Sequence, residues 1–308
     1  MRIWLWTWMM VAYGFVLVQT TLVQSVSAQS LHGFDLQGHR GYRARWPENS
    51  WVGMKAALDA GVATLEMDVV ISKDRQVVLS HEPWLNTEIC ETASALNLYQ
   101  MDYAQIRSYD CGSPKGHPRF PLQQIGPSPK PLLSEIFDSV RAYCNARGRV
   151  LPLWNIEIKS KKEWDGVYHP LPEDFVRLVL DVVKASGMKD RCMIQSFDRR
   201  IPRCVFAVDS TMELVVLEEY HRNPFKIMVA KRSLDAVGVP VGIYAPQYRM
   251  VTRRLVQCMH QRGIRVVPWT VNEPQAMRRL LQKGVDGLIT DDPGIFMRLK
   301  FPRAGQTP

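Results

Sequence analysis

The sequence predicts an α/β fold: a (β/α)8 or TIM barrel of parallel strands with an irregular insertion after the second barrel strand. The first observation is that short β-branched and apolar runs, typical of buried parallel strands, alternate along the chain with amphipathic segments of helical length. The second is that eight strand candidates occur, which is the number that closes a barrel. The third is that no GxGxxG motif follows the first strand, so the usual signature of an open dinucleotide-binding sheet is missing.

The elements follow one another with little interruption. The strand candidates are residues 34–41, 63–70, 153–159, 191–196, 212–217, 235–241, 265–271 and 285–290. The helix candidates are residues 50–60, 132–147, 173–186, 200–208, 224–234, 252–262 and 274–283. Several of these helices are followed by a glycine, which ends helices in the left-handed conformation: Gly61, Gly148, Gly187, Gly263 and Gly284.

One segment departs from the alternation of strand and helix. Residues 76–81 predict a short extra strand that returns from the second barrel strand after a turn at Lys73-Asp74. No simple βα unit follows, and residues 113–131 alone contain six prolines and two glycines. We therefore expect residues 84–131 to form an insertion at one end of the barrel.

Composition restricts the class of protein. The chain has 308 residues and 35.3 kDa, with 46% apolar and 22% charged residues, which excludes wholesale disorder and fibrous classes. Lys and Arg outnumber Asp and Glu by 39 to 30, a balance that suits an anionic substrate or an acidic surface. Because no run of Lys and Arg exceeds three residues, we expect no nucleic-acid partner.

The first 28 residues have the composition of a targeting segment. Arg2 precedes an apolar run over residues 3–18, and Val26-Ser27-Ala28 offers the small residues that signal peptidase accepts. We expect a cleavable signal peptide over residues 1–28 and an exported, periplasmic or secreted, single-domain chain over residues 29–308 without a stable membrane span. The alternative is an uncleaved anchor, although the run is shorter than the roughly 20 residues that a spanning helix prefers.

Polar residues of the predicted barrel gather at the carboxyl ends of the strands, where the active sites of such barrels lie. Strand residues two apart point to the same face, so Glu66 and Asp68 project together. Glu157 and Lys159 do the same on the next strand. Converging carboxylates repel one another unless a cation joins them, and an all-oxygen ligand set suits Ca²⁺ or Mg²⁺. Taken by itself, Glu-x-Asp is also typical of an exposed strand face.

Two histidines belong to the same end of the barrel. His39 lies at the end of the first strand, and His81 closes the extra strand. Because a histidine titrates near neutral pH, the two could act as a general base and a general acid. The remaining histidines have no such context and are expected to be structural or on the surface: His32, His117, His169, His221 and His260.

Seven short segments form a recognisable series. They are Gly38-His39-Arg40-Gly41, Pro47-Glu48-Asn49-Ser50, Leu65-Glu66-Met67-Asp68-Val69, His81-Glu82, Asn155-Ile156-Glu157-Ile158-Lys159, Trp269-Thr270-Val271-Asn272 and Asp286-Gly287-Leu288-Ile289-Thr290-Asp291. In this order and spacing they resemble the glycerophosphodiester phosphodiesterase family, in its exported bacterial form, over about residues 36 to 293.

The resemblance implies a TIM barrel that cleaves small-molecule glycerophosphodiesters to glycerol 3-phosphate and an alcohol with one divalent metal. The matching positions imply these roles: Glu66, Asp68 and Glu157 as metal ligands, His39 and His81 as the acid/base pair, Arg40 and Lys159 on the phosphate oxygens, and Trp269 beside the glycerol. The chain departs from the family at Glu82, where Asp is usual, so a carboxylate that orients His81 would reach one methylene further. Ser50 replaces the usual Thr, and either residue can cap the following helix.

Two other functions remain open at this stage. One is a phospholipase D-type enzyme acting on lysolipids or sphingolipids, which the insertion and the positive charge allow. The other is a protein that binds phosphodiesters without catalysis, although every matched catalytic position is present. The sequence gives no indication of the oligomeric state.

The six cysteines form no CxxC pair and no zinc-like spacing. Cys90 and Cys111 lie in the irregular insertion, whereas the others lie in or beside predicted regular elements: Cys144, Cys192, Cys204 and Cys258. Export favours disulfide formation, and closing this loop of about 20 residues contributes on the order of 3 kcal/mol. We predict a Cys90–Cys111 disulfide that shapes a lid over the leaving-group side of the cleft; the alternative is two free thiols in a mobile loop.

Overall fold

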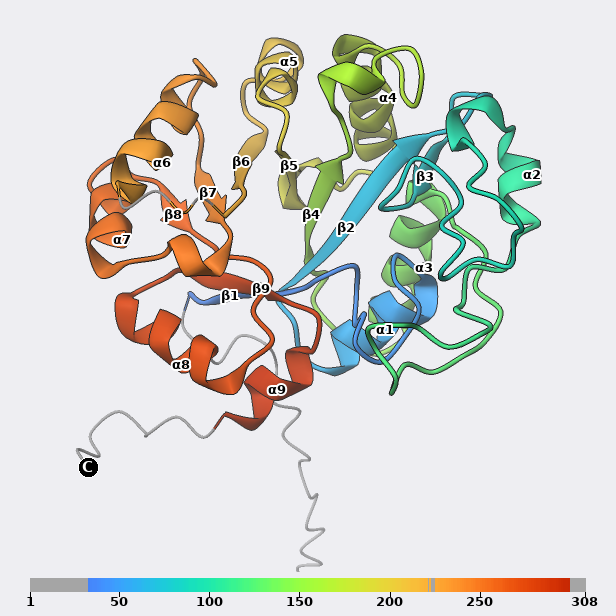
Figure 1. Cartoon of the computed structure of the whole chain (residues 1–308), viewed down its shortest axis with the longest axis horizontal. Coiled ribbons are helices and arrows are strands. Elements are labelled where there is room, and N and C mark those ends of the chain that lie inside the picture. Colours follow the sequence, from blue (N-terminus) through green and yellow to red (C-terminus); the bar gives the residue numbers. More distant parts are fainter. Residues whose placement is uncertain (1–32, 221, 223–224, 300–308) are drawn as a thin grey trace, which may run out of the picture.

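The computed structural model describes residues 33–220, 222 and 225–299, which form a parallel barrel surrounded by helices (Figure 1). The barrel strands are β1 (Asp35–Gly38), β2 (Thr64–Ile71), β4 (Leu153–Ile158), β5 (Cys192–Ser196), β6 (Glu213–Glu218), β7 (Ile243–Pro246), β8 (Arg265–Val266) and β9 (Gly287–Thr290). The predicted extra strand is β3 (Val77–Leu79), which pairs with β2 in antiparallel fashion. The predicted signal peptide, residues 1–28, lies outside the described residues.

The strands follow the order β8-β7-β6-β5-β4-β2-β1-β9, with parallel pairing throughout this path. Hydrogen bonds between β9 and the segment that continues from β8 close the ring. Val271 N donates to Ile289 O at 2.9 Å, and Ile289 N donates to Pro268 O at 2.9 Å. The TIM-barrel fold that the sequence predicts is therefore confirmed.

Helices connect the strands and cover the outside of the barrel (Figure 1). They are α1 (Trp51–Asp59), α2 (Tyr103–Arg107), α3 (Leu133–Asn145), α4 (Pro172–Ala185), α5 (Arg200–Val208), α6 (Lys226–Asp235), α7 (Arg253–His260), α8 (Pro274–Lys283) and α9 (Pro293–Arg298), with 3-10 turns at Leu98–Gln100, Lys162–Trp164, Lys189–Arg191 and Tyr248–Met250. The predicted cap forms, because Ser50 Oγ accepts a hydrogen bond from Gly53 N at 3.1 Å. All five glycines expected after helices have positive φ. Within residues 33–299 as described, no helix combines the length and apolarity needed to span a bilayer.

The apolar core has two main layers. The larger lies between the strands and the helices and includes Met67, Phe137 and Phe175. A smaller cluster from β5 to β9, which includes Val215 and Ile243, occupies another part of the barrel. The strands β1, β2, β4 and β5 instead bury polar side chains, and this difference places the polar site on one side of the barrel.

The insertion has a small core of its own. Its buried residues pack against Val70 of β2 and Val78 of β3. The predicted bridge is present within this core, with Cys90 and Cys111 joined at an S–S distance of 2.01 Å. Both cysteines are buried, so the bridge joins two parts of the insertion within its own core, while Trp84 and Arg119 reach the cleft.

The prediction of a strand over residues 235–241 was wrong. α6 runs on to Asp235, and β7 begins at Ile243. Alternating valines made the segment look like a strand, but Val237 and Val239 instead anchor the connection to the outer core. The predicted strand over residues 265–271 has regular strand geometry only at Arg265–Val266, since Pro268 has no N–H to donate.

Candidate active site

Three carboxylates meet at the carboxyl ends of β2 and β4. The register of these strands places Asp68 directly opposite Glu157. Glu66 lies two residues before Asp68 and therefore points to the same face of the sheet. All three side chains are buried, and one oxygen from each lies within 4.8 Å of the others. The structure therefore brings together the three residues predicted as metal ligands.

Glu66 is held from two directions. Its Oε2 accepts a hydrogen bond from Arg40 N at 2.8 Å, and its Oε1 accepts one from Gln195 Nε2 at 2.7 Å. Gln195 Oε1 accepts in turn from Asn155 Nδ2, which also donates to Gln37 Oε1. This chain of buried amides fixes the direction in which the Glu66 oxygens point.

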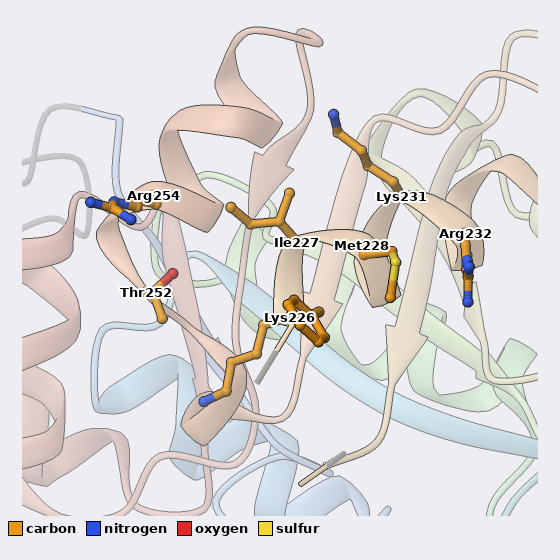
Figure 2. Close-up of a pocket in the computed structure, with 8 residues that line it drawn as sticks. Lys226, Ile227, Met228, Lys231, Arg232, Thr252 and Arg254 are labelled. Carbon is orange, nitrogen blue, oxygen red and sulfur yellow. The ribbon is translucent and has the colours of Figure 1, made fainter. Parts of the chain in front are cut away.

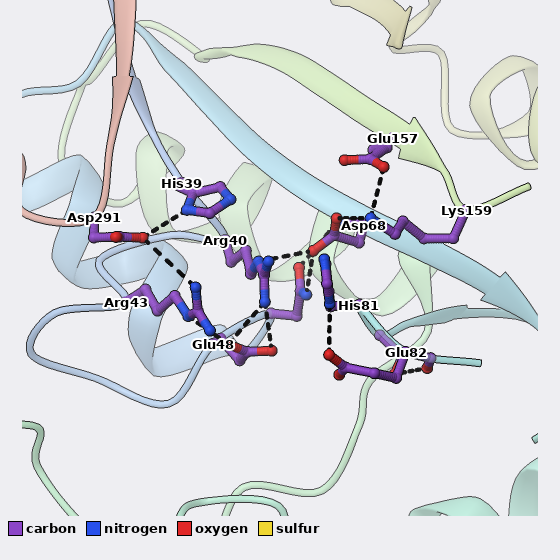
Figure 3. Close-up of polar contacts among 12 residues, drawn as sticks. His39, Arg40, Arg43, Glu48, Asp68, His81, Glu82, Glu157, Lys159 and Asp291 are labelled. Atoms are coloured by element: carbon purple, nitrogen blue, oxygen red, sulfur yellow. Dashed lines mark hydrogen bonds and ion pairs between the residues drawn. The ribbon is translucent and has the colours of Figure 1, made fainter. Parts of the chain in front are cut away.

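Asp68 is surrounded by donors and cations (Figure 3). Asn49 Nδ2 donates to Asp68 Oδ2 at 2.9 Å, and Arg40 Nε lies 3.2 Å from the same oxygen. Lys159 Nζ lies 2.6 Å from Glu157 Oε1 and 3.5 Å from Asp68 Oδ1. Asp68 Oδ1 is buried and has no hydrogen-bond partner among the described residues.

The charges of these groups are strongly perturbed. Burial, reinforced by the Asp68 and Glu157 carboxylates, raises the pKa of Glu66 well above its ordinary value. Burial also favours neutral Asp68, but Arg40 and Lys159 outweigh it and hold the pKa of Asp68 well below the ordinary value. A cation among these oxygens would relieve the repulsion that opposes ionised Glu66. The all-oxygen donor set, with Asp68 Oδ1 lacking a hydrogen bond, fits a hard divalent ion.

His39 is oriented by a carboxylate from the opposite end of the chain. Its Nδ1 lies 2.5 Å from Asp291 Oδ1, and Asn272 Nδ2 donates to Asp291 Oδ2 at 2.6 Å. Burial alone would raise the pKa of Asp291, but its contacts with His39, Arg43 and Asn272 together outweigh burial and lower the pKa to about 2. An ionised carboxylate only accepts, so His39 Nδ1 carries the proton and Nε2 holds the free lone pair. Burial lowers the pKa of His39, and Asp291 offsets this only in part.

His81 has the same arrangement with a local partner. Its Nδ1 lies 2.6 Å from Glu82 Oε1, so the longer carboxylate at this position does reach the imidazole. Burial, together with the Arg40 and Lys159 charges, lowers the pKa of His81. Both imidazoles therefore favour the neutral state, in which a ring nitrogen can accept a proton.

Arg40 connects the two parts of the site. Its backbone adopts a left-handed conformation with φ of 52°, which is uncommon outside glycine. From there its Nη1 donates to both oxygens of Glu48 at 3.0 Å, and Glu48 also pairs with Arg43 Nε. The guanidinium is thus fixed between Glu48 and Asp68 (Figure 3).

The site opens into a cleft of roughly 500 Å³. Both histidines, Glu66, Glu157, Arg40 and Lys159 line it, together with Trp269 and Thr270. Trp269 Nε1 donates to Ala245 O at 2.9 Å, and its ring packs edge-on against Phe197 with centroids 5.4 Å apart. Trp84 and Trp164 form a second aromatic wall, also edge-on, with centroids 5.8 Å apart.

Five residues that hold the site together had no role assigned to them from the sequence. They are Arg43, Glu48, Asn49, Gln195 and Asp291. Glu48, Asn49 and Asp291 lie inside the motifs that carried the resemblance, so the signal was present but their side-chain partners were not deducible. Arg43 had no motif signal.

A (β/α)8 barrel that gathers carboxylates, carboxylate-bound imidazoles and cations at the carboxyl ends of its strands has the active site of a barrel enzyme that uses acid/base chemistry. The family model for the glycerophosphoryl diester phosphodiesterase family matches residues 39–295. The chain therefore belongs to that family and is a phosphoric diester hydrolase.

Individual relatives agree with this assignment. The chain is 26% identical over 265 residues to a glycerophosphodiester phosphodiesterase of Caldanaerobacter subterraneus, covering 85% of this chain and 95% of that protein. It is 24% identical over 273 residues to Lysophospholipase D GDPD1 of Rattus norvegicus, covering 83% and 82%. The crystal structure of a candidate glycerophosphoryl diester phosphodiesterase from Silicibacter pomeroyi is similar with a TM-score of 0.75 and 28% identity, covering 86% of this chain and 92% of that one.

Proposed function

We propose that the chain hydrolyses glycerophosphodiesters to glycerol 3-phosphate and an alcohol, with one divalent cation and two histidines. The observation that carries the proposal is a cluster of three buried carboxylates, with ligand oxygens within 4.8 Å of one another. Two of them, Glu66 and Glu157, line the same cleft as the two carboxylate-bound imidazoles. Family membership supplies the reaction class.

Glu66, Asp68 and Glu157 would hold the cation. When bound, it would supply positive charge that neutralises the phosphodiester and the extra charge that develops at phosphorus. We propose Ca²⁺ before Mg²⁺, because Ca²⁺ tolerates several carboxylates and irregular geometry. We also propose that the protein is exported and works outside the cytoplasm, on the basis of the residue pattern of positions 1–28.

The histidines would move the protons. One neutral imidazole removes the proton from the glycerol hydroxyl next to the ester oxygen, and that oxygen attacks phosphorus. The other histidine must first take up a proton, although burial favours its neutral form, and it donates that proton to the departing alcohol. Water then opens the cyclic phosphate with the two roles reversed. Because the attacking hydroxyl belongs to the substrate, proximity contributes to the rate.

The cations of the cleft would bind the phosphate. Burial alone would lower the pKa of Lys159, but Glu157 and Asp68 outweigh it and raise the pKa, so the ammonium stays charged. Arg40 is already fixed by Glu48 and needs little reorganisation to meet an anion. Trp269 would pack against the glycerol carbons.

A substrate panel tests the proposal. Glycerophosphocholine should be hydrolysed, a chelator should stop the reaction, and added divalent metal should restore it. Bis(p-nitrophenyl) phosphate has no vicinal hydroxyl and should be a poor substrate. Rapid turnover of this diester relative to glycerophosphocholine would refute attack by the substrate hydroxyl. Export is tested separately by comparing the N-terminus of the periplasmic or secreted protein with residue 29.

A second candidate function is lysophospholipase D activity on lysolipids. The relative of that name in Rattus norvegicus favours it, and the aromatic wall of Trp84 and Trp164 offers an apolar surface beside the cleft. Comparing choline release from lysophosphatidylcholine and from glycerophosphocholine separates the two functions, because only lysophosphatidylcholine requires room for an acyl chain.

A further inference from the structure

A second hollow of about 600 Å³ lies away from the active site, between α6 and the N-terminal part of α7 (Figure 2). Its lining includes four cationic residues, Lys226, Lys231, Arg232 and Arg254, and among the described lining residues none is acidic. In Figure 2, Arg254 lies on one side of the hollow and Lys231 and Arg232 on the other. The hollow therefore has a positive rim on both sides.

Large apolar side chains are exposed in the same place. Phe225 is 66% exposed and Met228 is 38% exposed, and both line the hollow. Tyr220, earlier in the same connection between β6 and α6, is 46% exposed. Aromatic and apolar side chains surrounded by Lys and Arg match the composition of segments that bind at the surface of anionic bilayers.

The hollow is on the mouth side of the barrel. The connection that leads to Phe225 starts at Glu219, which lines the active-site cleft. The connection after β7 leads to Thr252 and α7, and its Tyr248 N donates to the backbone of Trp269 at 2.8 Å. Lys226 Nζ donates to Arg249 O at 2.6 Å, which fastens the two connections to each other. A surface bound here would lie on the same side as the cleft.

We propose that Phe225, Met228, Lys231, Arg232 and Arg254 form an interfacial docking surface for a lipid bilayer or micelle that carries anionic headgroups. The cations bind the headgroups, and Phe225 and Met228 enter the boundary between headgroups and acyl chains. Docking brings the cleft close to lipid-derived substrates. The surface acts in binding alone and takes no part in the chemistry of the cleft.

Co-sedimentation of the full chain with vesicles tests the proposal. The protein should bind vesicles of phosphatidylcholine mixed with phosphatidylglycerol, and bind phosphatidylcholine alone much more weakly. Each cation near an anionic surface contributes an attraction that corresponds to about a fivefold change in affinity, so Lys231→Gln/Arg254→Gln should weaken binding about 25-fold. Phe225→Ser should weaken it about tenfold and leave the residual binding more sensitive to salt.

A matched control changes the same charge elsewhere. Arg177 and Lys184 are exposed on α4, and Arg177→Gln/Lys184→Gln should bind vesicles like the wild type. All variants should hydrolyse soluble glycerophosphocholine at the wild-type rate, which shows that they are folded and separates this test from that of the proposed function. Equal binding to neutral vesicles, or equal losses in the two double variants, would overturn the proposal. Binding to a single-stranded oligonucleotide without binding to vesicles would also overturn it.

Discussion

Replacing Asp291 with Asn should reverse the proton arrangement of His39. In the wild type, ionised Asp291 accepts from His39 Nδ1 and leaves Nε2 free to take a proton. Asn272 Nδ2 donates to the other oxygen of Asp291 at 2.6 Å, while Asn272 Oδ1 accepts from Asp291 N at 2.9 Å. The orientation of the Asn272 amide is therefore fixed, and its Nδ2 requires a hydrogen-bond acceptor from the side chain of residue 291.

In the Asp291→Asn variant, the introduced amide must then turn its oxygen to Asn272 and its NH₂ group to His39. An NH₂ donor facing Nδ1 forces the proton onto Nε2, where the lone pair is needed. Because one positioned acid or base contributes about 10²–10⁴-fold, kcat should fall by roughly that factor. Asp291 raises the pKa of His39 in the wild type, so its neutralisation lowers that pKa. If His39 is the base, the acid limb of the residual activity moves to lower pH.

The assay is a pH profile of kcat/KM for glycerophosphocholine, together with metal content and a melting curve. Asp292→Asn is the matched control, because Asp292 is equally buried at the same strand end but bonds Tyr42 and caps α9 instead of touching a histidine. It should keep nearly full activity. An Asp291→Asn enzyme within threefold of wild type with an unchanged profile would refute the proposed role of Asp291.

Three further predictions concern separate parts of the molecule. His81→Ala should keep its metal and lose roughly 100-fold or more in rate, and loss of metal would instead make His81 a ligand. Gln195→Leu removes the donor to Glu66 Oε1 and should weaken metal affinity about 10–100-fold in a calorimetric titration, whereas unchanged affinity would remove Gln195 from the site. Cys90→Ser/Cys111→Ser removes a bridge spanning 21 residues, worth on the order of 3 kcal/mol, so the melting temperature should fall roughly 5–10 °C, and an unchanged melting temperature would contradict a stabilising bridge.

Period-two alternation and barrel topology were enough to predict the carboxylate cluster. Glu66 and Asp68 share a face by alternation, and adjacency of β2 and β4 brings Glu157 opposite Asp68. The eightfold repeat similarly predicted the fold. The strand wrongly predicted at residues 235–241 has valines at alternate positions. This pattern alone does not distinguish a β-strand from a loop whose valines pack on the core.

The partners of the catalytic side chains could not be predicted in the same way. Arg40 contacts both Glu48 and Asp68 from a backbone conformation with positive φ, which its residue type does not indicate. His39 and Asp291 are 252 residues apart in the sequence, and their contact requires that β9 pair with β1. Such contacts depend on the exact positions of distant residues in the folded chain, which a residue pattern does not specify.

The central claim is that Glu66, Asp68 and Glu157 hold one divalent cation that hydrolysis requires. The most direct measurement is elemental mass spectrometry of the purified chain and of Glu66→Gln, Asp68→Asn and Glu157→Gln, each paired with a glycerophosphocholine assay before and after chelation. We expect one Ca²⁺ or Mg²⁺ per wild-type chain, activity that chelation abolishes and metal restores, and loss of both metal and activity in every variant while the barrel stays folded. A chelated, metal-free chain that hydrolyses glycerophosphocholine at the wild-type rate would contradict the claim.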